Sequence, residues 1–183
     1  MKFYDCVTAP SPRRVRIFLA EKGISIETVQ VDLRNGEQFG AAFRAINPDS
    51  TVPVLVLDSG AAITDIVAIC RYLEELHPEP NLFGRDAKER ATIDMWIRRV
   101  EFRLMMPVGQ IWVHTHPFTA TVATKAFGQQ FKEFGAANRN LVDAACRLFD
   151  EELGGRGYVA SERYTMADIV AQTTFDFAPF APS

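Results

Sequence analysis

The sequence predicts an α/β domain at residues 1–77, followed by an all-α helical domain at residues 86–183. In the first part, short apolar runs of strand length alternate with segments whose apolar residues recur at helical spacing. The stretch at residues 78–85 contains two prolines and a glycine, which is typical of a linker. After it the apolar residues keep to helical spacing, and no further strand is expected. These three observations divide the chain into two domains.

The first domain opens with a short strand at residues 2–6. A helix is expected to follow with Ser11 as its N-cap, because serine caps helices well and Pro12 suits the first helical position. Gly23 is expected to end this helix, since glycine readily adopts the left-handed conformation found just beyond a helix C-terminus. Residues 24–31 alternate imperfectly between apolar and polar side chains, which indicates a second strand.

The rest of the first domain is expected to hold a short helix, two strands and a final helix. The short, irregular helix is predicted at residues 37–46, and the strands are centred near Val54 and Ala62. Pro53 heads the first of these strands, where a missing N–H does little harm and a cis peptide bond is a candidate. The final helix is predicted at about residues 65–76. The resulting order, β-α-β-α-β-β-α, is the thioredoxin-like arrangement.

The second domain is expected to contain four helices. The first begins near Asp86, and Pro107 must kink or interrupt it. Thr165 and Asp168 have the spacing of a capping box that opens the last helix. Between the first helix and the last, two more helices are predicted at residues 120–134 and 136–153.

Composition and charge narrow the classes of function. Apolar residues make up 48% and charged residues 23% of the 183 residues, and the formal net charge is −3. There is no basic stripe, which argues against nucleic acid and anionic membranes as partners. No apolar run approaches the roughly 18 residues needed to span a bilayer. The three cysteines, Cys6, Cys70 and Cys146, are widely separated, which argues against a disulfide framework and favours a cytoplasmic location.

Four stretches carry a resemblance to a known family. Two lie at the centre of the first domain: N-P-D-S-T-V-P-V-L at residues 47–55 and I-T-D-I-V-A-I-C-R-Y-L at 63–73. The other two are S-P-R-R-V-R-I-F-L-A-E-K-G-I at 11–24 and Y-V-A-S-E-R-Y-T-M-A-D-I at 158–169. Taken in chain order, the four stretches resemble those of the cytosolic glutathione S-transferase family, and specifically a bacterial-type subgroup of it.

The resemblance implies a thioredoxin-like domain that binds glutathione and a helical domain that supplies a pocket for a hydrophobic electrophile. It implies an enzyme of detoxification, a glutathione transferase, with glutathione as co-substrate and no metal. A cytoplasmic homodimer is implied in the same way. The family usually continues beyond the capping-box helix, so the helical domain is expected to be short at its C-terminal end.

The implied reaction needs a group that favours the thiolate of glutathione over the thiol, whose pKa is about 8.5 in isolation. Ser11 offers a hydroxyl at a helix N-terminus, where it would donate a hydrogen bond to the sulfur. The family's hydroxyl usually lies further upstream, near Ala9, which makes Thr8 a competitor. Cys6 is a third candidate, because a mixed disulfide with glutathione would give thiol-transferase chemistry. Tyr4 is a fourth, and for both Tyr4 and Cys6 a place in the core is favoured over a role in the reaction.

Six residues are placed at the glutathione site by the resemblance: Gln38, Thr51, Val52, Pro53, Asp65 and Ile66. The backbone of Val52 would pair with the cysteinyl part of glutathione. Asp65 would accept from the γ-glutamyl ammonium, or would simply cap the helix. The Ile66 N–H would meet the γ-glutamyl carboxylate, but the family usually has serine there, so one hydrogen bond of about 1 kcal/mol is lost. Gln38 matches a position that often contacts the glycine carboxylate, and a solvated helix-start residue is the alternative.

Three other functions stay open on the sequence alone. Cys6 would support a Cys-dependent glutathione thiol-transferase or reductase. Ile66 and the unassigned hydroxyl favour a non-catalytic glutathione-transferase-like binding protein. An isomerase that uses glutathione as a cofactor is also compatible with the motifs.

Overall fold

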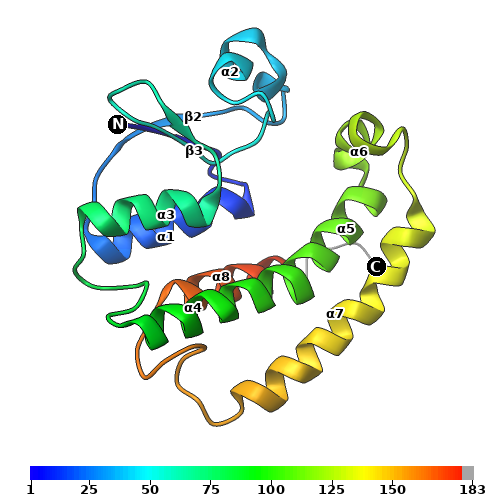
Figure 1. Ribbon diagram of the computed structural model, residues 1–183. Coiled ribbons are helices and arrows are strands. Elements are labelled where there is room, and N and C mark those ends of the chain that lie inside the picture. Colours follow the sequence, from blue (N-terminus) through cyan, green and yellow to red (C-terminus); the bar gives the residue numbers. More distant parts are fainter. Residues whose placement is uncertain (179–183) are drawn as a thin grey trace. The chain divides into compact units, whose positions relative to one another are not determined.

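The computed structural model describes residues 1–178 of the chain (Figure 1). It contains two compact units, the first at Met1–Phe83 and the second beginning at Gly84. The first unit combines strands and helices, whereas all regular elements described in the second are helical. The expected fold class is therefore confirmed. No helix in the described part of the chain is long and apolar enough to cross a membrane.

The first unit is built on a four-stranded mixed sheet with the strand order β2-β1-β3-β4. Its strands are β1 (Lys2–Asp5), β2 (Glu27–Gln30), β3 (Val54–Val56) and β4 (Ala62–Ile63). β1 runs parallel to β2 and antiparallel to β3, which in turn runs antiparallel to β4. The parallel pair requires a crossover connection, which a helix supplies, and the β3–β4 pair forms a hairpin. This is the predicted thioredoxin-like arrangement.

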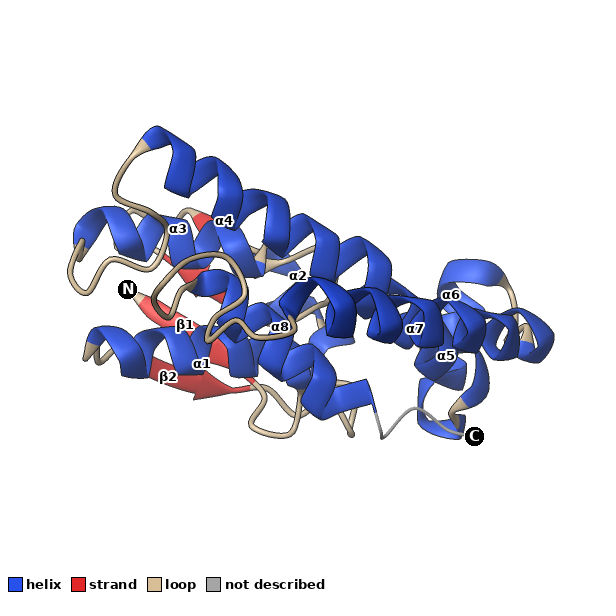
Figure 2. Ribbon diagram, turned by 90° about the horizontal axis from the view of Figure 1, so that it is seen from below, coloured by secondary structure: helices blue, strands red, loops and turns tan. Residues whose placement is uncertain are grey.

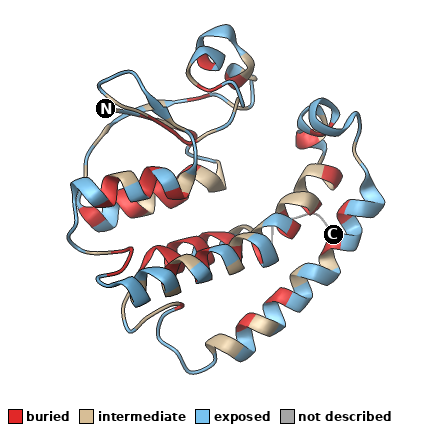
Figure 3. Ribbon diagram, viewed as in Figure 1, coloured by how far each residue is buried: buried red, intermediate tan, exposed pale blue. Residues whose placement is uncertain are grey.

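Helices lie on both faces of this sheet. α1 (Pro10–Lys22) and α3 (Ile66–Leu76) lie side by side on one face, and α2 (Ala41–Ile46) lies on the other (Figure 1). Buried residues recur along α1 and α3 between exposed ones (Figure 3), as expected of helices with one side against the rest of the unit. The central strands β1 and β3 are thus covered by helices on both faces, whereas β2 and β4 stay largely exposed.

The side chains of the central strands divide between these two layers. Tyr4 and Val54 are paired across β1 and β3, and both pack with Phe43 of α2. Phe3 and Leu55 form the next pair and are almost fully buried. Because successive side chains of a strand point to opposite faces, Phe3 and Leu55 point toward α1 and α3.

The prediction that Ser11 caps the first helix is wrong. α1 begins at Pro10, and its N-cap is Ala9, in extended conformation with φ −87° and ψ 139°. Pro10 opens the helix because its fixed φ and missing N–H both suit the first helical position. Gly23 ends α1 as predicted, in the left-handed conformation with φ 64°, and its N–H donates to the C=O of Ala20.

Other boundaries in the first unit also differ from the prediction. β1 ends at Asp5, and β2 is confined to four residues rather than covering 24–31. The helix expected at 37–46 is divided into a 3₁₀ turn, η1 (Glu37–Phe39), and α2. Gly40, extended with φ −68° and ψ 152°, separates the two because an extended residue cannot continue a helix.

The first long helix of the second unit has three consecutive segments: α4 (Ala87–Val100), a π-helical turn η2 (Glu101–Met105) and α5 (Met106–Thr115). Asp86 caps it, since its Oδ1 accepts from the N–H of Glu89 at 2.8 Å. Pro107 is near the start of α5, directly after the π-helical turn. The expected interruption therefore takes the form of a local widening of the helix, after which the chain continues as α5.

The remaining helices are η3 (Pro117–Thr119), α6 (Ala120–Phe127), α7 (Lys132–Leu153) and α8 (Met166–Phe177). The predicted helix at 120–134 is too long, because Gly128 adopts φ 83° and ends α6. The capping box that opens α8 is confirmed: Asp168 Oδ2 accepts from the Thr165 N–H at 2.8 Å.

Two helix pairs form the core of the second unit. α5 and α7 pack closely (Figures 1 and 2), and Gly135 permits this, because a Cβ there would lie 2.7 Å from Thr115 Cγ2. α8 packs on α4, and its first six residues are all buried (Figure 3). The side chains of Ile93 and Ile97 from α4 and of Ile169 from α8 are fully buried.

Candidate functional site

Four segments of the first unit meet at one edge of the sheet. Tyr4, near the end of β1, is paired with Val54 at the start of β3. The loop after β1 and the segment that carries Val52 therefore leave the sheet at the same edge. β4 runs in the same direction as β1 and ends at Ile63, opposite Leu55, so the N-terminus of α3 lies at this edge too. The N-terminus of α1 follows the loop after β1 directly and completes the set (Figure 1).

The loop after β1 contains two of the candidate catalytic residues. The Ala9 N–H donates to the C=O of Cys6 at 2.9 Å, which closes a tight turn. The Cys6 Sγ lies 3.4 Å from the Thr8 Oγ1, within hydrogen-bonding distance for sulfur. Cys6 is only 8% exposed, whereas Thr8 is on the surface. The hydroxyl of Thr8 is thus accessible, and the thiol of Cys6 is largely covered.

Three polar side chains that the sequence reasoning missed hold this loop. Asp5 is 2% exposed, and its carboxylate accepts from the Arg16 guanidinium and from Gln30 Nε2, the latter at 2.8 Å. Arg16 also donates to the C=O of Val7 at 3.0 Å, and Gln30 Oε1 accepts from the Val7 N–H at 2.9 Å. The signal in the sequence is an acidic residue, Asp5, at the end of an apolar strand, where burial requires a partner.

The N-terminus of α1 presents one N–H group in its first turn. Pro10 and Pro12 have no N–H, so Ser11 alone supplies a backbone donor there. The Ser11 side chain is half-buried, and its hydroxyl makes no hydrogen bond within the described residues. Ser11 therefore brings an N–H and an O–H donor to the positive end of the helix dipole.

The segment before β3 presents backbone groups at the same edge. The Val52–Pro53 peptide bond is cis, which was a candidate conformation. Asn47, 1% exposed, donates from Nδ2 to the C=O of Thr51 at 2.9 Å and to its Oγ1 at 3.1 Å. Neither the N–H nor the C=O of Val52 bonds to another described residue. Thr51 is thus engaged in the turn, and Val52 offers its backbone to a ligand.

The N-terminus of α3 is a second set of donors. Asp65 is the N-cap, and its Oδ1 accepts from the Ala68 N–H at 2.8 Å. The Asp65 C=O accepts from the Ile69 N–H at 2.9 Å. Ile66 and Val67 occupy the first turn, where N–H groups have no partner within the helix. Asp65 therefore caps α3 through one oxygen, and its Oδ2 stays exposed to a ligand.

Gln38 is buried, at 8% exposure, so it is not a solvated helix-start residue. Its Oε1 has no hydrogen-bond partner in the described part of the chain, which is uncommon for a buried amide. No contact recorded for the described residues joins Gln38 to the loop after β1 or to α3. Of the predicted glutathione ligands, it is the one that the geometry does not connect with the others.

Of the remaining side chains with reactive groups, Tyr4 is half-buried, Cys70 is buried and Cys146 is exposed. Tyr4 packs edge-on against Phe43, with ring centroids 6.0 Å apart. Burial raises the pKa of the Cys70 thiol well above its ordinary value, and nearby Asp65 raises it further. The pKa of Cys146 is also raised by burial. Both thiols are therefore poor nucleophiles. Among the described residues, no three His, Cys, Asp or Glu side chains are grouped so as to hold a metal ion.

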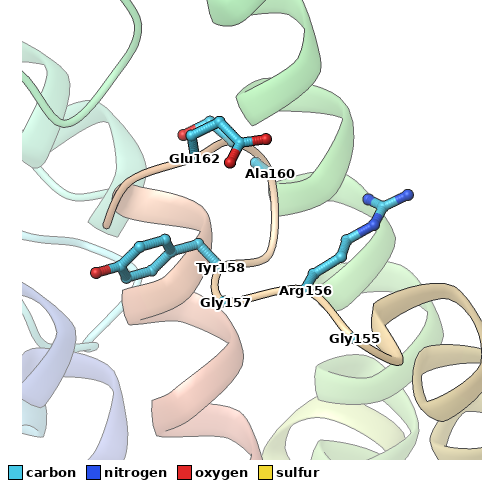
Figure 4. A pocket seen from close by; sticks show the side chains of 7 residues that line it. Gly155, Arg156, Gly157, Tyr158, Ala160 and Glu162 are labelled. Atoms are coloured by element: carbon cyan, nitrogen blue, oxygen red, sulfur yellow. The ribbon is translucent and has the colours of Figure 1, made fainter.

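A cavity of about 470 Å³ lies in the second unit, in the loop between α7 and α8. It is lined by residues of that loop alone, including Gly155, Gly157 and Ser161. Figure 4 shows the side chains of Arg156 and Tyr158 pointing away from each other, and they do not converge on a common point. The cavity therefore offers no set of groups for catalysis.

Known proteins are similar to this chain in sequence and in fold. Residues 8–76 match the family model "Glutathione S-transferase, N-terminal domain". Glutathione S-transferase 2 of Saccharomyces cerevisiae is 37% identical over 180 residues, which cover 97% of this chain and 76% of the yeast protein. The chain belongs to the glutathione S-transferase family. Its membership confirms the resemblance that the four sequence stretches carried and the prediction of a transferase that uses glutathione.

Two further relatives show how far the similarity extends. The crystal structure of a glutathione S-transferase domain-containing protein of Marinobacter aquaeolei superposes with a TM-score of 0.89. That protein is 39% identical, with 99% of this chain and 88% of the solved chain covered. Glutathione S-transferase Z1 of Arabidopsis thaliana is 45% identical over 91 residues, 50% of this chain and 41% of the plant protein. The similarity to the plant transferase is thus confined to about half of this chain.

Proposed function

We propose that this member of the family conjugates the glutathione thiolate to a hydrophobic electrophile. The observation that carries the proposal is the meeting, at one edge of the sheet, of the Val52 backbone, the N-terminus of α3 and two hydroxyls. A small anionic peptide needs a backbone edge, donors for its carboxylate and an acceptor for its ammonium. This edge supplies all three.

Glutathione would bind through complementary polar groups. The N–H and C=O of Val52 would pair with the cysteinyl residue, as a strand edge pairs with an added strand. The N–H groups of Ile66 and Val67 would bind the γ-glutamyl carboxylate at the positive end of α3. The Asp65 Oδ2, which the helix cap leaves unused, would accept from the γ-glutamyl ammonium. The family resemblance alone assigns Gln38 to the glycine carboxylate, to which its Nε2 would donate.

Ser11 is our first choice for the group that activates the thiol. Its O–H and N–H lie together at the N-terminus of α1, where both favour a negative charge on sulfur. The Thr8 hydroxyl is second, because it lies 3.4 Å from the Cys6 Sγ and is partly engaged there. With an activated aryl chloride, the thiol proton would pass to solvent. The sulfur–carbon bond would form, and chloride would leave with the electron pair of the carbon–chlorine bond.

The test is the ultraviolet absorbance of bound glutathione thiolate from about pH 5 to pH 9, in the wild type and in Ser11→Ala, Thr8→Ala and Cys6→Ala. We expect a thiol pKa well below that of free glutathione, restored toward about 8.5 by Ser11→Ala. If Thr8→Ala restored the thiol pKa instead, Thr8 would be the residue that activates the thiol. Bound glutathione with an unshifted thiol in the wild type would overturn conjugation and favour the non-catalytic binding protein.

The rival redox function makes a different prediction for the same variants. A Cys-dependent thiol-transferase would need the Cys6 thiolate to attack a glutathione mixed disulfide and release the glutathione thiolate. Cys6→Ala would then abolish transfer, whereas Ser11→Ala would not. The 8% exposure of Cys6 disfavours this attack.

The proposal also includes a homodimer in the cytoplasm. Its support is the family to which the chain belongs, together with three cysteines that form no disulfide in the structure. Light scattering of the purified chain would measure the mass directly. A monomeric mass at all concentrations would overturn the homodimer.

A further inference from the structure

The contacts of Asp5, Arg16 and Gln30 have a common target in the loop after β1. We call these three residues the loop clamp. The Arg16 guanidinium reaches the Asp5 carboxylate and two main-chain carbonyls, those of Cys6 at 3.3 Å and Val7 at 3.0 Å. Gln30 bridges Asp5 and the Val7 N–H with its two amide atoms, at 2.8 and 2.9 Å. Each member of the clamp comes from a different element.

The clamp fixes the backbone of Val7 and leaves the Val7 side chain outside. Both main-chain polar groups of Val7 are bonded to clamp side chains, while the Val7 side chain is 67% exposed. The backbone at Val7 is therefore held by the clamp and not by packing of the Val7 side chain. The Asp5 C=O is engaged as well, since it accepts from the Val31 N–H at 2.7 Å. Hydrogen bonds to the main chain of Asp5, Cys6 and Val7 therefore fix the path of the chain from β1 into α1.

We propose that Asp5, Arg16 and Gln30 are positioning residues for thiol activation. This inference rests on the proposed function, because it concerns where the hydroxyls of Thr8 and Ser11 are held. A hydrogen bond to sulfur weakens steeply when its donor moves or tilts, and small displacements of a catalytic group are costly. The clamp holds the hydroxyls of Thr8 and Ser11 in fixed positions. Its own side chains do not contact glutathione.

Gln30→Leu is the best probe of the clamp. Gln30 is exposed on β2, so its replacement is compatible with folding, and leucine removes both hydrogen bonds at similar volume. Thr28→Val is the matched control on the same strand, because Thr28 Oγ1 donates only to the nearby C=O of Ile26 among the described residues. Arg16→Lys is a second probe, since lysine keeps the charge beside Asp5 but cannot reach both carbonyls.

Two readouts separate positioning from binding. The thiolate absorbance gives the pKa of bound glutathione, and titration with S-methylglutathione, which has no thiol proton, gives the affinity of the rest of the site. For Gln30→Leu we expect the thiol pKa to rise toward that of free glutathione and kcat with chlorodinitrobenzene to fall about tenfold or more. Its affinity for S-methylglutathione should stay within about twofold of the wild type. Arg16→Lys should show the same pattern more weakly, and Thr28→Val should match the wild type.

The outcomes distinguish this inference from the proposed function. A wild type that lowers the thiol pKa, together with a Gln30→Leu variant that lowers it equally, would overturn the clamp alone. Equal losses in thiol acidification and in S-methylglutathione affinity would also overturn it, because they would indicate a general structural role. A wild type that binds S-methylglutathione without acidifying the thiol of glutathione would overturn the proposed function and the clamp with it.

Discussion

Lys22 of α1 and Glu74 of α3 form an ion pair in the interior of the first unit. Their side chains are 0% and 7% exposed, and the Lys22 Nζ lies 2.5 Å from the Glu74 Oε2. Lys22 also donates to the C=O of His77 at 2.7 Å. The other carboxylate oxygen, Oε1, accepts from the N–H groups of Leu82 and Phe83, at 3.0 and 3.4 Å. The pair thus joins both helices to the segment that follows α3.

Removal of one partner of this pair should destabilise the protein strongly. Lys22→Met leaves a buried carboxylate, and Glu74→Gln leaves a buried ammonium, so we expect each to cost about 3–5 kcal/mol of unfolding free energy. The double variant should cost less than the sum, because no unpaired charge remains and glutamine still accepts from Leu82. Urea unfolding followed by circular dichroism measures all three.

The control for this pair is the ion pair between Lys2 and Glu27 on the sheet surface. Their side chains are 52% and 61% exposed, with Nζ and Oε1 2.9 Å apart. Lys2→Met should change stability little, because water solvates both charges once they part. If Lys22→Met and Glu74→Gln lowered the unfolding free energy as little as Lys2→Met does, burial would not explain the strength of the Lys22–Glu74 pair.

Glu89 of α4 should contribute to the loss of stability in acid. The hydrogen bond from the Arg85 N–H at 2.8 Å, together with the Arg163 guanidinium at 2.9 Å, holds the pKa of Glu89 below its ordinary value. A carboxyl with a lowered pKa in the folded state stabilises it above the unfolded pKa, which is about 4.3. That stability is lost as the pH falls through the folded pKa.

Glu89→Gln should therefore flatten the decline of unfolding free energy below about pH 4.3. Arg163→Gln should flatten it only in part, because the Arg85 N–H is the larger cause of the lowered pKa. Unfolding free energy measured at a series of pH values checks both. Identical acid slopes for wild type and Glu89→Gln would show that the lowered pKa of Glu89 does not contribute.

The features that the sequence predicted well are those encoded locally. Gly23 ends α1, Asp65 caps α3, and Thr165 with Asp168 opens α8, each through residues within a few positions of one another. The order of strands and helices followed in the same way from periodicity and turn residues. The start of α1 was predicted wrongly, because both Pro10 and Pro12 suit the first helical position. The prediction took Pro12, whereas the helix begins at Pro10.

The features that the sequence did not predict depend on contacts between distant residues. Asp5 bonds to Arg16 and Gln30, which are 11 and 25 positions away, and no local pattern in the sequence pairs these side chains. Burial of Gln38 depends in the same way on how η1 packs. Local pattern therefore located the edge of the sheet where the candidate site lies, but not the side chains that hold it.

The last prediction separates the two roles of Asp65, helix cap and glutathione ligand. Asparagine caps helices as well as aspartate does, so Asp65→Asn should keep the bond to the Ala68 N–H and leave stability within about 0.5 kcal/mol. It removes the negative charge, and we expect its affinity for S-methylglutathione to fall about tenfold or more, because a charge-assisted bond to the ammonium is lost. Calorimetric titration measures this affinity.

Asp65→Ala completes the comparison, since alanine removes both the cap and the charge. It should lose about 1 kcal/mol of stability in addition to the same fall in affinity. If Asp65→Asn bound S-methylglutathione as tightly as the wild type, then Asp65 would be a helix cap alone. The ammonium of glutathione would in that case need another acceptor at this edge of the sheet, and the proposed binding mode would be wrong at that point.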